Sequence, residues 1–190
     1  MNSHLHWSSH LLRSLYCNEV RHLVLSPGSR STPLAMAAAI HSGFQRHVVI
    51  DERSAGFMAL GIGKATGTPA ALICTSGTAG ANYMPSIIEA RQSGVPVIVL
   101  TADRPPNQRG IGSSQTIDQV KLFGDHAVFF HEAGEPVFSR TDLQRLSFLA
   151  RQAVEESVRI GGAVHINLPF RKPLEPETEE IEQESLLNQE

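Results

Sequence analysis

Cysteine is scarce in this sequence. Cys17 and Cys74 are the only two cysteines in 190 residues, they lie far apart, and no C-x-x-C pair occurs. A framework of disulfide bonds and a metal site built from thiolates are therefore excluded as the basis of the fold. We expect both cysteines to be small core residues.

Long apolar runs and strong positive charge are also missing. No stretch approaches the roughly 18 apolar residues of a membrane span, and the first residues, MNSHLHWSSHLL, are too polar for a secretory signal. We therefore expect a cytoplasmic chain that does not insert into membranes. The net charge is -3, and seven of the nineteen acidic residues fall within residues 171–190. The remainder has slightly more bases than acids, which excludes a case for nucleic acid but suits small anions.

Several familiar motifs are absent as well. The segment GIGKATG (residues 61–67) misses the G-x-G-x-x-G spacing and falls inside a predicted helix, and neither a P-loop nor a G-x-S-x-G motif occurs. His4, His6 and His10 have a loose metal-like spacing. They are expected on an exposed N-terminal segment without a carboxylate or thiolate companion, so we predict no metal site there.

Short apolar runs alternate with longer amphipathic segments along the chain. In a sequence with 41% hydrophobic and 18% charged residues, this alternation is typical of an α/β domain. We predict a doubly wound, mainly parallel sheet with helices on both faces. The predicted strands are residues 22–26, 47–50, 70–75, 95–101, 127–132 and 163–168. The predicted helices include an N-terminal one with Leu5, Leu12, Leu15 and Tyr16 on one face, and residues 31–43, 54–67, 80–94 and 139–162.

Two of these helices have clear end signals. Ser31 is a candidate N-cap, Pro33 suits the first turn, and Gly43 is a good C-cap for the first of them. The next follows the predicted strand over residues 47–50, and Asp51 and Glu52 come directly after that strand. One carboxylate suffices as a cap, and Asp51 fits that role, so Glu52 stands at the carboxyl end of a strand, where open α/β sheets bind ligands.

Polar residues follow most of the predicted strands, and a doubly wound sheet gathers them along one edge. SPGSRST (26–32) offers hydroxyls and the Arg30 guanidinium to a carboxylate or phosphate, although a tight turn with a cap explains Ser31 equally well. TSGTAG (75–80) is a weaker candidate of the same kind, because its glycines could simply allow close packing. Arg104 is stiffened by two following prolines, or it is a surface arginine paired with Asp103. The long segment 101–119 is rich in Gly and Pro and is expected to be functional.

Five segments together carry a resemblance to a known family. They are SPGSRSTPL (26–34), DERSAGF (51–57), TSGTAGAN (75–82), LTADRPP (100–106) and VHINLPFRKPL (164–174). They resemble the N-terminal, pyrimidine-binding domain of the thiamin-diphosphate-dependent enzymes. The resemblance is strongest to the menaquinone-pathway branch, whose members decarboxylate 2-oxoglutarate and add the resulting succinyl carbanion equivalent to isochorismate.

The resemblance implies roles for individual residues. Glu52 would hydrogen-bond N1′ of the cofactor's aminopyrimidine and act as the catalytic carboxylate. Ser114 departs from an amide found in some relatives. The implied cofactor-binding residues are Glu52, Ser76, Gly77 and Thr78. The implied substrate-binding residues are Ser29, Arg30, Arg104 and Gln115.

The resemblance also implies parts that this chain does not supply. Family members hold Mg²⁺ and the diphosphate through a G-D-G motif in a second domain, whereas the only GD here is Gly124-Asp125, followed by His126. We therefore expect no metal site in this chain, a pyrimidine-binding domain over residues 1–174, and an acidic linker or frayed tail over residues 175–190 that leads to a missing domain.

The implied full-length protein is a transferase that works as a homodimer or homotetramer, and this part alone is expected to be inactive. Two alternatives stay open at this point. One is a non-catalytic binding or assembly module of the same fold, and the other is an acetolactate synthase-like enzyme with a different substrate pocket.

Overall fold

The apolar runs of the sequence form six strands, and the computed structural model, which describes residues 3–187, pairs all of them in parallel. The order across the sheet is β2-β1-β3-β4-β6-β5. Such a sheet needs crossover helices on its faces, so the predicted doubly wound fold is confirmed and the sheet is wholly parallel. The strands are β1 (His22–Leu25), β2 (Gln45–Val48), β3 (Ala70–Cys74), β4 (Val97–Asp103), β5 (Ala127–Glu132) and β6 (Ala163–Pro169).

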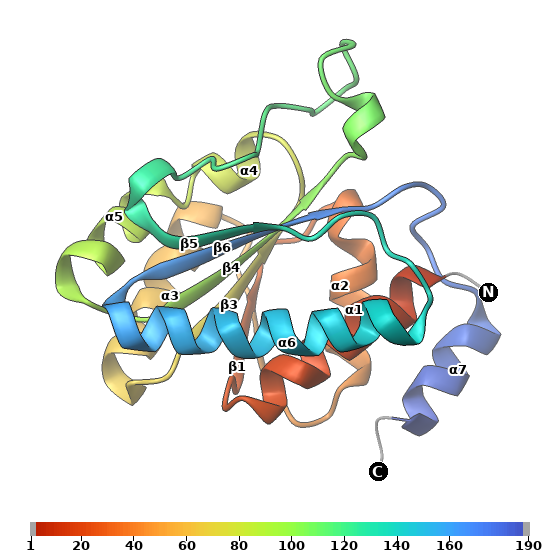
Figure 1. Cartoon of the computed structure of the whole chain (residues 1–190), viewed down its shortest axis with the longest axis horizontal. Coiled ribbons are helices and arrows are strands. Elements are labelled where there is room, and N and C mark those ends of the chain that lie inside the picture. The colour runs from red at the N-terminus through yellow and green to blue at the C-terminus, as the bar shows by residue number, and fades with distance from the viewer. Residues whose placement is uncertain (1–2, 188–190) are drawn as a thin grey trace.

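Helices cover both faces of the sheet (Figure 1). Between helices and sheet lie two apolar cores. One core lies beneath α1 (Ser3–Cys17), α2 (Thr32–Ile40) and α6 (Arg140–Glu156). The other lies beneath α3 (Glu52–Thr66) and α5 (Met84–Ser93). The central strands β3 and β4 are buried on both faces, which is why β3 and residues 97–100 of β4 are continuous apolar runs.

Among residues 3–187, no helix is long and apolar enough to cross a membrane. The remaining helical segments are short. These segments are η1 (Ser29–Ser31), α4 (Thr78–Ala81), η2 (Pro106–Gln108), η3 (Gly124–His126), a π-helical turn over Ser157–Gly161, and α7 (Thr178–Leu187).

Element ends differ from the sequence prediction at several places, and β4, for example, begins and ends two residues later than predicted. Helix α2 ends before Gly43, because His41 leaves the helical conformation and its ring packs against Phe44 at 4.7 Å between centroids. Strand β2 begins two residues earlier than predicted, since Gln45 pairs with His22 at the sheet edge. An edge strand tolerates polar side chains, so hydrophobicity alone placed it wrongly.

The two cysteines lie in different environments. Cys74 is buried, as expected, whereas Cys17 is exposed at the end of α1, so the core prediction for Cys17 is wrong. The sequence pattern has one apolar face on this helix, with Leu5, Leu12 and Leu15 buried, and Cys17 falls outside it.

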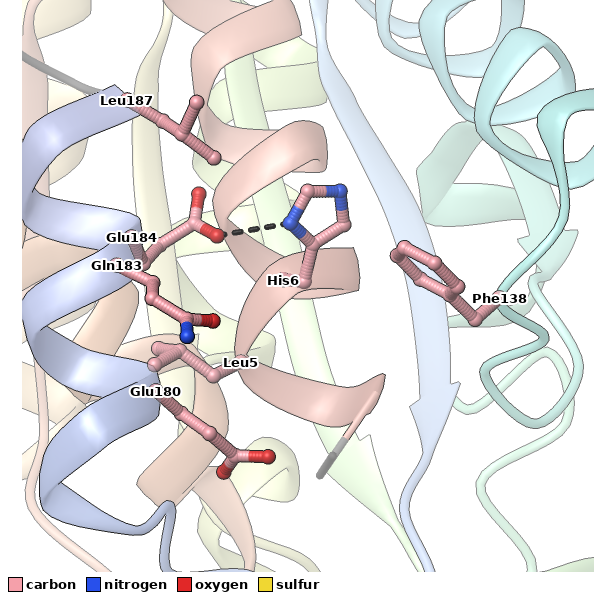
Figure 2. Close-up of a pocket in the computed structure, with 7 residues that line it drawn as sticks. All are labelled: Leu5, His6, Phe138, Glu180, Gln183, Glu184 and Leu187. Carbon is pink, nitrogen blue, oxygen red and sulfur yellow. Dashed lines mark hydrogen bonds and ion pairs between the residues drawn. The ribbon is translucent and has the colours of Figure 1, made fainter.

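The acidic tail is partly helical where the structure describes it, although most of its side chains are exposed. Residues Thr178–Leu187 form α7, which packs beside α1. The carboxylate of Glu184 is 3% exposed and contacts His6 Nδ1 at 2.8 Å and Arg13 Nη2 at 3.1 Å. Figure 2 shows Glu184 pointing from α7 toward His6, with Phe138 on the other side of the imidazole. Basic side chains of α1 therefore compensate the acidic helix, which composition alone did not reveal.

Helix α1 likewise corrects the expectation of an exposed N-terminal histidine segment. His4 and His10 are half-buried, and His10 Nε2 lies 2.8 Å from Ser147 Oγ on α6. Burial lowers the pKa of both imidazoles. These histidines are therefore part of the helix packing.

Candidate anion-binding and cofactor site

Arg30 is fixed in the turn that follows β1. Its side chain is buried, its Nη1 donates to the carbonyl of Phe170 at 2.7 Å, and its backbone N donates to Thr75 Oγ1 at 3.2 Å. No acceptor among residues 3–187 meets its Nε. Burial and then the charge of Arg104 lower the pKa of Arg30. A guanidinium held so firmly, with a buried donor left unsatisfied, is suited to receive an anion.

Close approach of Gly28 to the Thr75 side chain makes this turn possible. A Cβ atom on Gly28 would lie 2.3 Å from Thr75 Cβ, so the loop after β1 can contact β3 only with glycine here. Ser31 stands at the N-cap position of α2, but its hydroxyl donates to the carbonyl of Gly28 at 2.9 Å and does not cap the helix. Ser29 is exposed at the same turn. The capping explanation for the motif is thus insufficient.

Arg104 lies at the end of β4 and faces the same region. Its guanidinium donates to Ser76 Oγ and, at 2.8 Å, to the carbonyl of Gln115. Only its backbone N contacts Asp103, at 2.7 Å. The alternative of a simple ion pair between the two side chains is therefore wrong, because Asp103 pairs with Arg109 at 2.7 Å.

A cavity of about 530 Å³ brings the predicted arginines together. Four cationic side chains line it. Sequence analysis named Arg30 and Arg104 as site residues but not Arg171 or Lys172. Arg171 is oriented by Glu135, with contacts of 2.8 and 2.9 Å. The polar segment after the last strand was the available signal for these additional cations. The lining residues are Arg30, Arg104, Gln108, Ser113, Ser114, Arg171 and Lys172.

Gln115 is positioned beside this cavity but is not among the residues that line it. Its amide donates to the carbonyl of Ser76 at 3.2 Å, and its backbone has a φ of +55°. Its predicted contact with substrate stays a prediction. Ser114, the residue that departs from the family pattern, does line the cavity.

The two carboxylates that begin α3 have separate environments. Asp51 caps the helix, since its Oδ1 accepts from Ser54 N at 2.7 Å. Glu52 is half-buried and is left free of that role. Its negative charge acts on two buried groups: burial raises the pKa of Cys74 and of Tyr83, and Glu52 raises both further. The Glu52 carboxylate therefore lies close enough to Cys74 and Tyr83 for its charge to act on them.

The loop after β3 contains the three remaining residues predicted to bind the cofactor. Ser76 is fully buried, Gly77 is buried with a φ of +84°, and Thr78 is exposed at the start of α4. The left-handed backbone at Gly77 favours glycine. The structure thus places the three predicted loop residues together, near Arg104.

Next to Arg104 in the chain, Asp103 belongs to a partly buried polar network that sequence analysis missed. Arg109 joins Asp103 of β4 and Glu132 of β5, each at 2.7 Å. The amide nitrogen of Asn167, on β6, donates to both carboxylates at 2.8 Å. Burial raises the pKa of Asp103, while the Asn167 hydrogen bond and Arg109 oppose this effect. Partners so far apart in sequence leave no local signal.

Within the described residues, 3–187, no three His, Cys, Asp or Glu side chains gather as a metal site would require. The donor set of the cavity is cationic and amidic, which does not fit a divalent cation. The geometry instead fits carboxylate or phosphate groups.

Comparison with known proteins gives a consistent result. Residues 6–122 match the family described as "Thiamine pyrophosphate enzyme, N-terminal TPP binding domain". Proteins named 2-succinyl-5-enolpyruvyl-6-hydroxy-3-cyclohexene-1-carboxylate (SEPHCHC) synthase are similar to the chain. The protein of Sorangium cellulosum is 51% identical over 92% of the chain and 29% of its own length. That of Myxococcus xanthus is 46% identical over 97% of the chain and 32% of its own length. The chain thus spans about 30% of these relatives.

Proposed function

Because the chain belongs to the thiamine pyrophosphate enzyme family, we propose that it is the pyrimidine-binding domain of a SEPHCHC synthase of menaquinone biosynthesis. The proposed enzyme is a transferase that decarboxylates 2-oxoglutarate and adds the resulting succinyl unit to isochorismate. The single observation that carries this proposal is the pair of fixed guanidinium groups, Arg30 and Arg104, in one cavity. The names of the similar proteins support the choice within the family.

Glu52 fits the role of the carboxylate that contacts the cofactor. It is half-buried at the carboxyl end of the β2 edge, and Asp51 alone serves as the helix cap. When bound, thiamin diphosphate supplies a thiazolium carbon that can become a carbanion. Glu52 would hold a proton at N1′ of the aminopyrimidine, for which a carboxylate in a partly desolvated cleft is well suited. Thr78, exposed on the neighbouring loop, is a further candidate contact.

The cationic cavity fits the proposed substrates, both of which carry two carboxylates. A guanidinium binds a planar carboxylate through two parallel hydrogen bonds, so it sets orientation as well as affinity. Arg30 and Arg104 are both held by protein acceptors and need little reorganisation on binding. We assign them, with Ser29 and Gln115 at the rim, to carboxylate recognition.

Other parts of the proposed enzyme would come from outside residues 3–187. Because the described residues do not fit a divalent cation, we assign Mg²⁺ and the diphosphate to a further domain. Large apolar side chains exposed on β2, the segment after it, and α3 support self-association as a homodimer or homotetramer. They are Val48 (72% exposed), Ile50 (83%), Phe57 (45%) and Met58 (38%).

Replacement of Glu52 in the full-length protein tests the cofactor role. With 2-oxoglutarate and isochorismate as substrates, we expect Glu52→Gln to slow turnover by on the order of 10² to 10⁴, the usual scale for a positioned proton-transfer group. Glu89→Gln, at an exposed position on α5, is the matched control and should keep normal turnover. Wild-type turnover in Glu52→Gln would refute the assignment.

Replacement of Arg30 tests the substrate class separately. Arg30→Ala should raise KM for the dicarboxylates by at least about tenfold, since a charged hydrogen bond contributes roughly 1.5–3 kcal/mol. An unchanged KM together with an inactive Glu52→Gln would indicate a family member with another pocket, such as an acetolactate synthase-like enzyme. No activity in the wild-type protein would favour a non-catalytic module.

A further inference from the structure

One peptide group of the loop after β3 is held from two sides. The carbonyl of Ser76 accepts from Gln115 Nε2 at 3.2 Å, and the N–H of Gly77 donates to Gln119 Oε1 at 2.8 Å. These two atoms belong to the same peptide unit. A rotation of that unit would therefore break both hydrogen bonds at once.

The backbone at Gly77 is shaped for this contact. A Cβ atom there would lie 3.0 Å from both the Cγ and the carbonyl oxygen of Gln115. The segment that carries the two glutamines thus lies directly against the glycine. Only a residue without a side chain allows this distance together with a φ of +84°.

Gln119 is the firmer of the two glutamines. It is fully buried, whereas Gln115 is exposed. Its Nε2 donates to the carbonyl of Ala102 at 3.2 Å and to Asn167 Oδ1 at 3.0 Å. The amide of Gln119 is therefore anchored to β4 and β6 while its oxygen receives the loop.

Ser76, which supplies the carbonyl of this peptide unit, also contacts Arg104 through its hydroxyl. The Ser76 hydroxyl and the Gln115 carbonyl are the two acceptors of the Arg104 guanidinium. A shift of the loop would therefore displace the Ser76 hydroxyl, one of the two acceptors that hold Arg104. Gln119 contacts neither the cavity nor Arg104, so it acts through the loop.

We propose that Gln119 is a positioning residue, which fixes the Ser76–Gly77 peptide and thereby orients Arg104 toward a substrate carboxylate. The kinetic part of this inference rests on the proposed function. It also assigns the Ser76 carbonyl and the Gly77 N–H to contacts within the chain, which leaves Thr78 as the residue of this loop that faces outward.

Gln119→Met in the full-length protein provides the test, because methionine matches glutamine in length and lacks its hydrogen bonds. Gln92→Met, at an exposed position on α5, is the matched control. We expect amide hydrogen exchange at Gly77 to become at least about tenfold faster in Gln119→Met and to stay unchanged in Gln92→Met. With 2-oxoglutarate and isochorismate, KM should rise about tenfold with little change in kcat, since weakened carboxylate binding affects ground and transition states alike.

The two measurements separate this inference from the proposed function. Unchanged exchange at Gly77 in a folded Gln119→Met protein would overturn the inference, whatever reaction the enzyme catalyses. Faster exchange with unchanged KM would overturn the positioning role. Faster exchange in a protein that does not use these substrates would refute the proposed function. It would still show that Gln119 holds the Ser76–Gly77 peptide.

Discussion

Lowering the pH should destabilise the chain through His165, a residue at the centre of the sheet. Its side chain is fully buried on β6, between Phe123 and Phe130, and burial lowers its pKa to about 3. An unfolded histidine has a pKa of about 6.5. Between these two values the unfolded chain binds one more proton than the folded chain, so the contribution of His165 to stability is lost as the pH falls below about 6.5.

The size of the effect follows from this difference in pKa. Each pH unit within the window costs up to about 1.4 kcal/mol, so His165 alone should lower the free energy of unfolding by roughly 2 kcal/mol between pH 7 and pH 5. Urea denaturation followed by circular dichroism at pH 5, 6 and 7 measures it. Burial also lowers the pKa of other histidines, among them His22 and His131, so the effect must be taken as a difference between proteins.

His165→Gln supplies that difference, because glutamine can still donate toward Thr101 but does not titrate. The variant should lose the roughly 2 kcal/mol of pH dependence assigned to His165 and keep the rest. An equal change in the free energy of unfolding for both proteins between pH 7 and pH 5 would show that His165 is not the buried neutral imidazole described above.

Three further changes test the geometry. Gly28→Ala should lower the free energy of unfolding by about 1–3 kcal/mol in urea denaturation, because the added Cβ overlaps Thr75; a variant as stable as wild type would contradict the close approach. Asp51→Ala should lower the melting temperature and Glu52→Ala should not, since only Asp51 caps α3; equal losses would contradict this division of roles. Glu184→Leu removes the contacts of α7 with His6 and Arg13, so protease should cleave the C-terminal helix faster than in wild type. Unchanged cleavage would show that these ion pairs do not hold α7 in place.

The architecture was predictable because burial on both faces leaves a strong signal in a parallel strand. Strands β3 and β4 are fully buried and were both identified, β3 to within one residue and β4 two residues too early. Edge strand β2 was placed two residues late, because an edge position relaxes the demand for apolar side chains. Helix α7 was missed because its stability depends on contacts with α1 rather than on its own composition.

The site was predictable only in part for a similar reason. Arg30 and Arg104 each follow a strand, and the rule that strand ends meet at one edge brought them together. The links that hold them are different, since Gln119 meets Gly77 across 42 residues and Asn167 meets Asp103 across 64. Such contacts depend on the folded topology, and nothing in the neighbouring sequence indicates them.

The polar network around Asp103 and Asn167 also fixes the direction of its protons. The carboxylates of Asp103 and Glu132 require donors, so the Asn167 amide turns its nitrogen toward them and its oxygen toward Thr101. The Thr101 hydroxyl donates its single hydrogen to that oxygen. It can therefore only accept a hydrogen bond from His165 Nε2, 2.8 Å away. Two acidic groups at one side of the sheet thereby select the Nε2–H tautomer of an imidazole that neither of them touches.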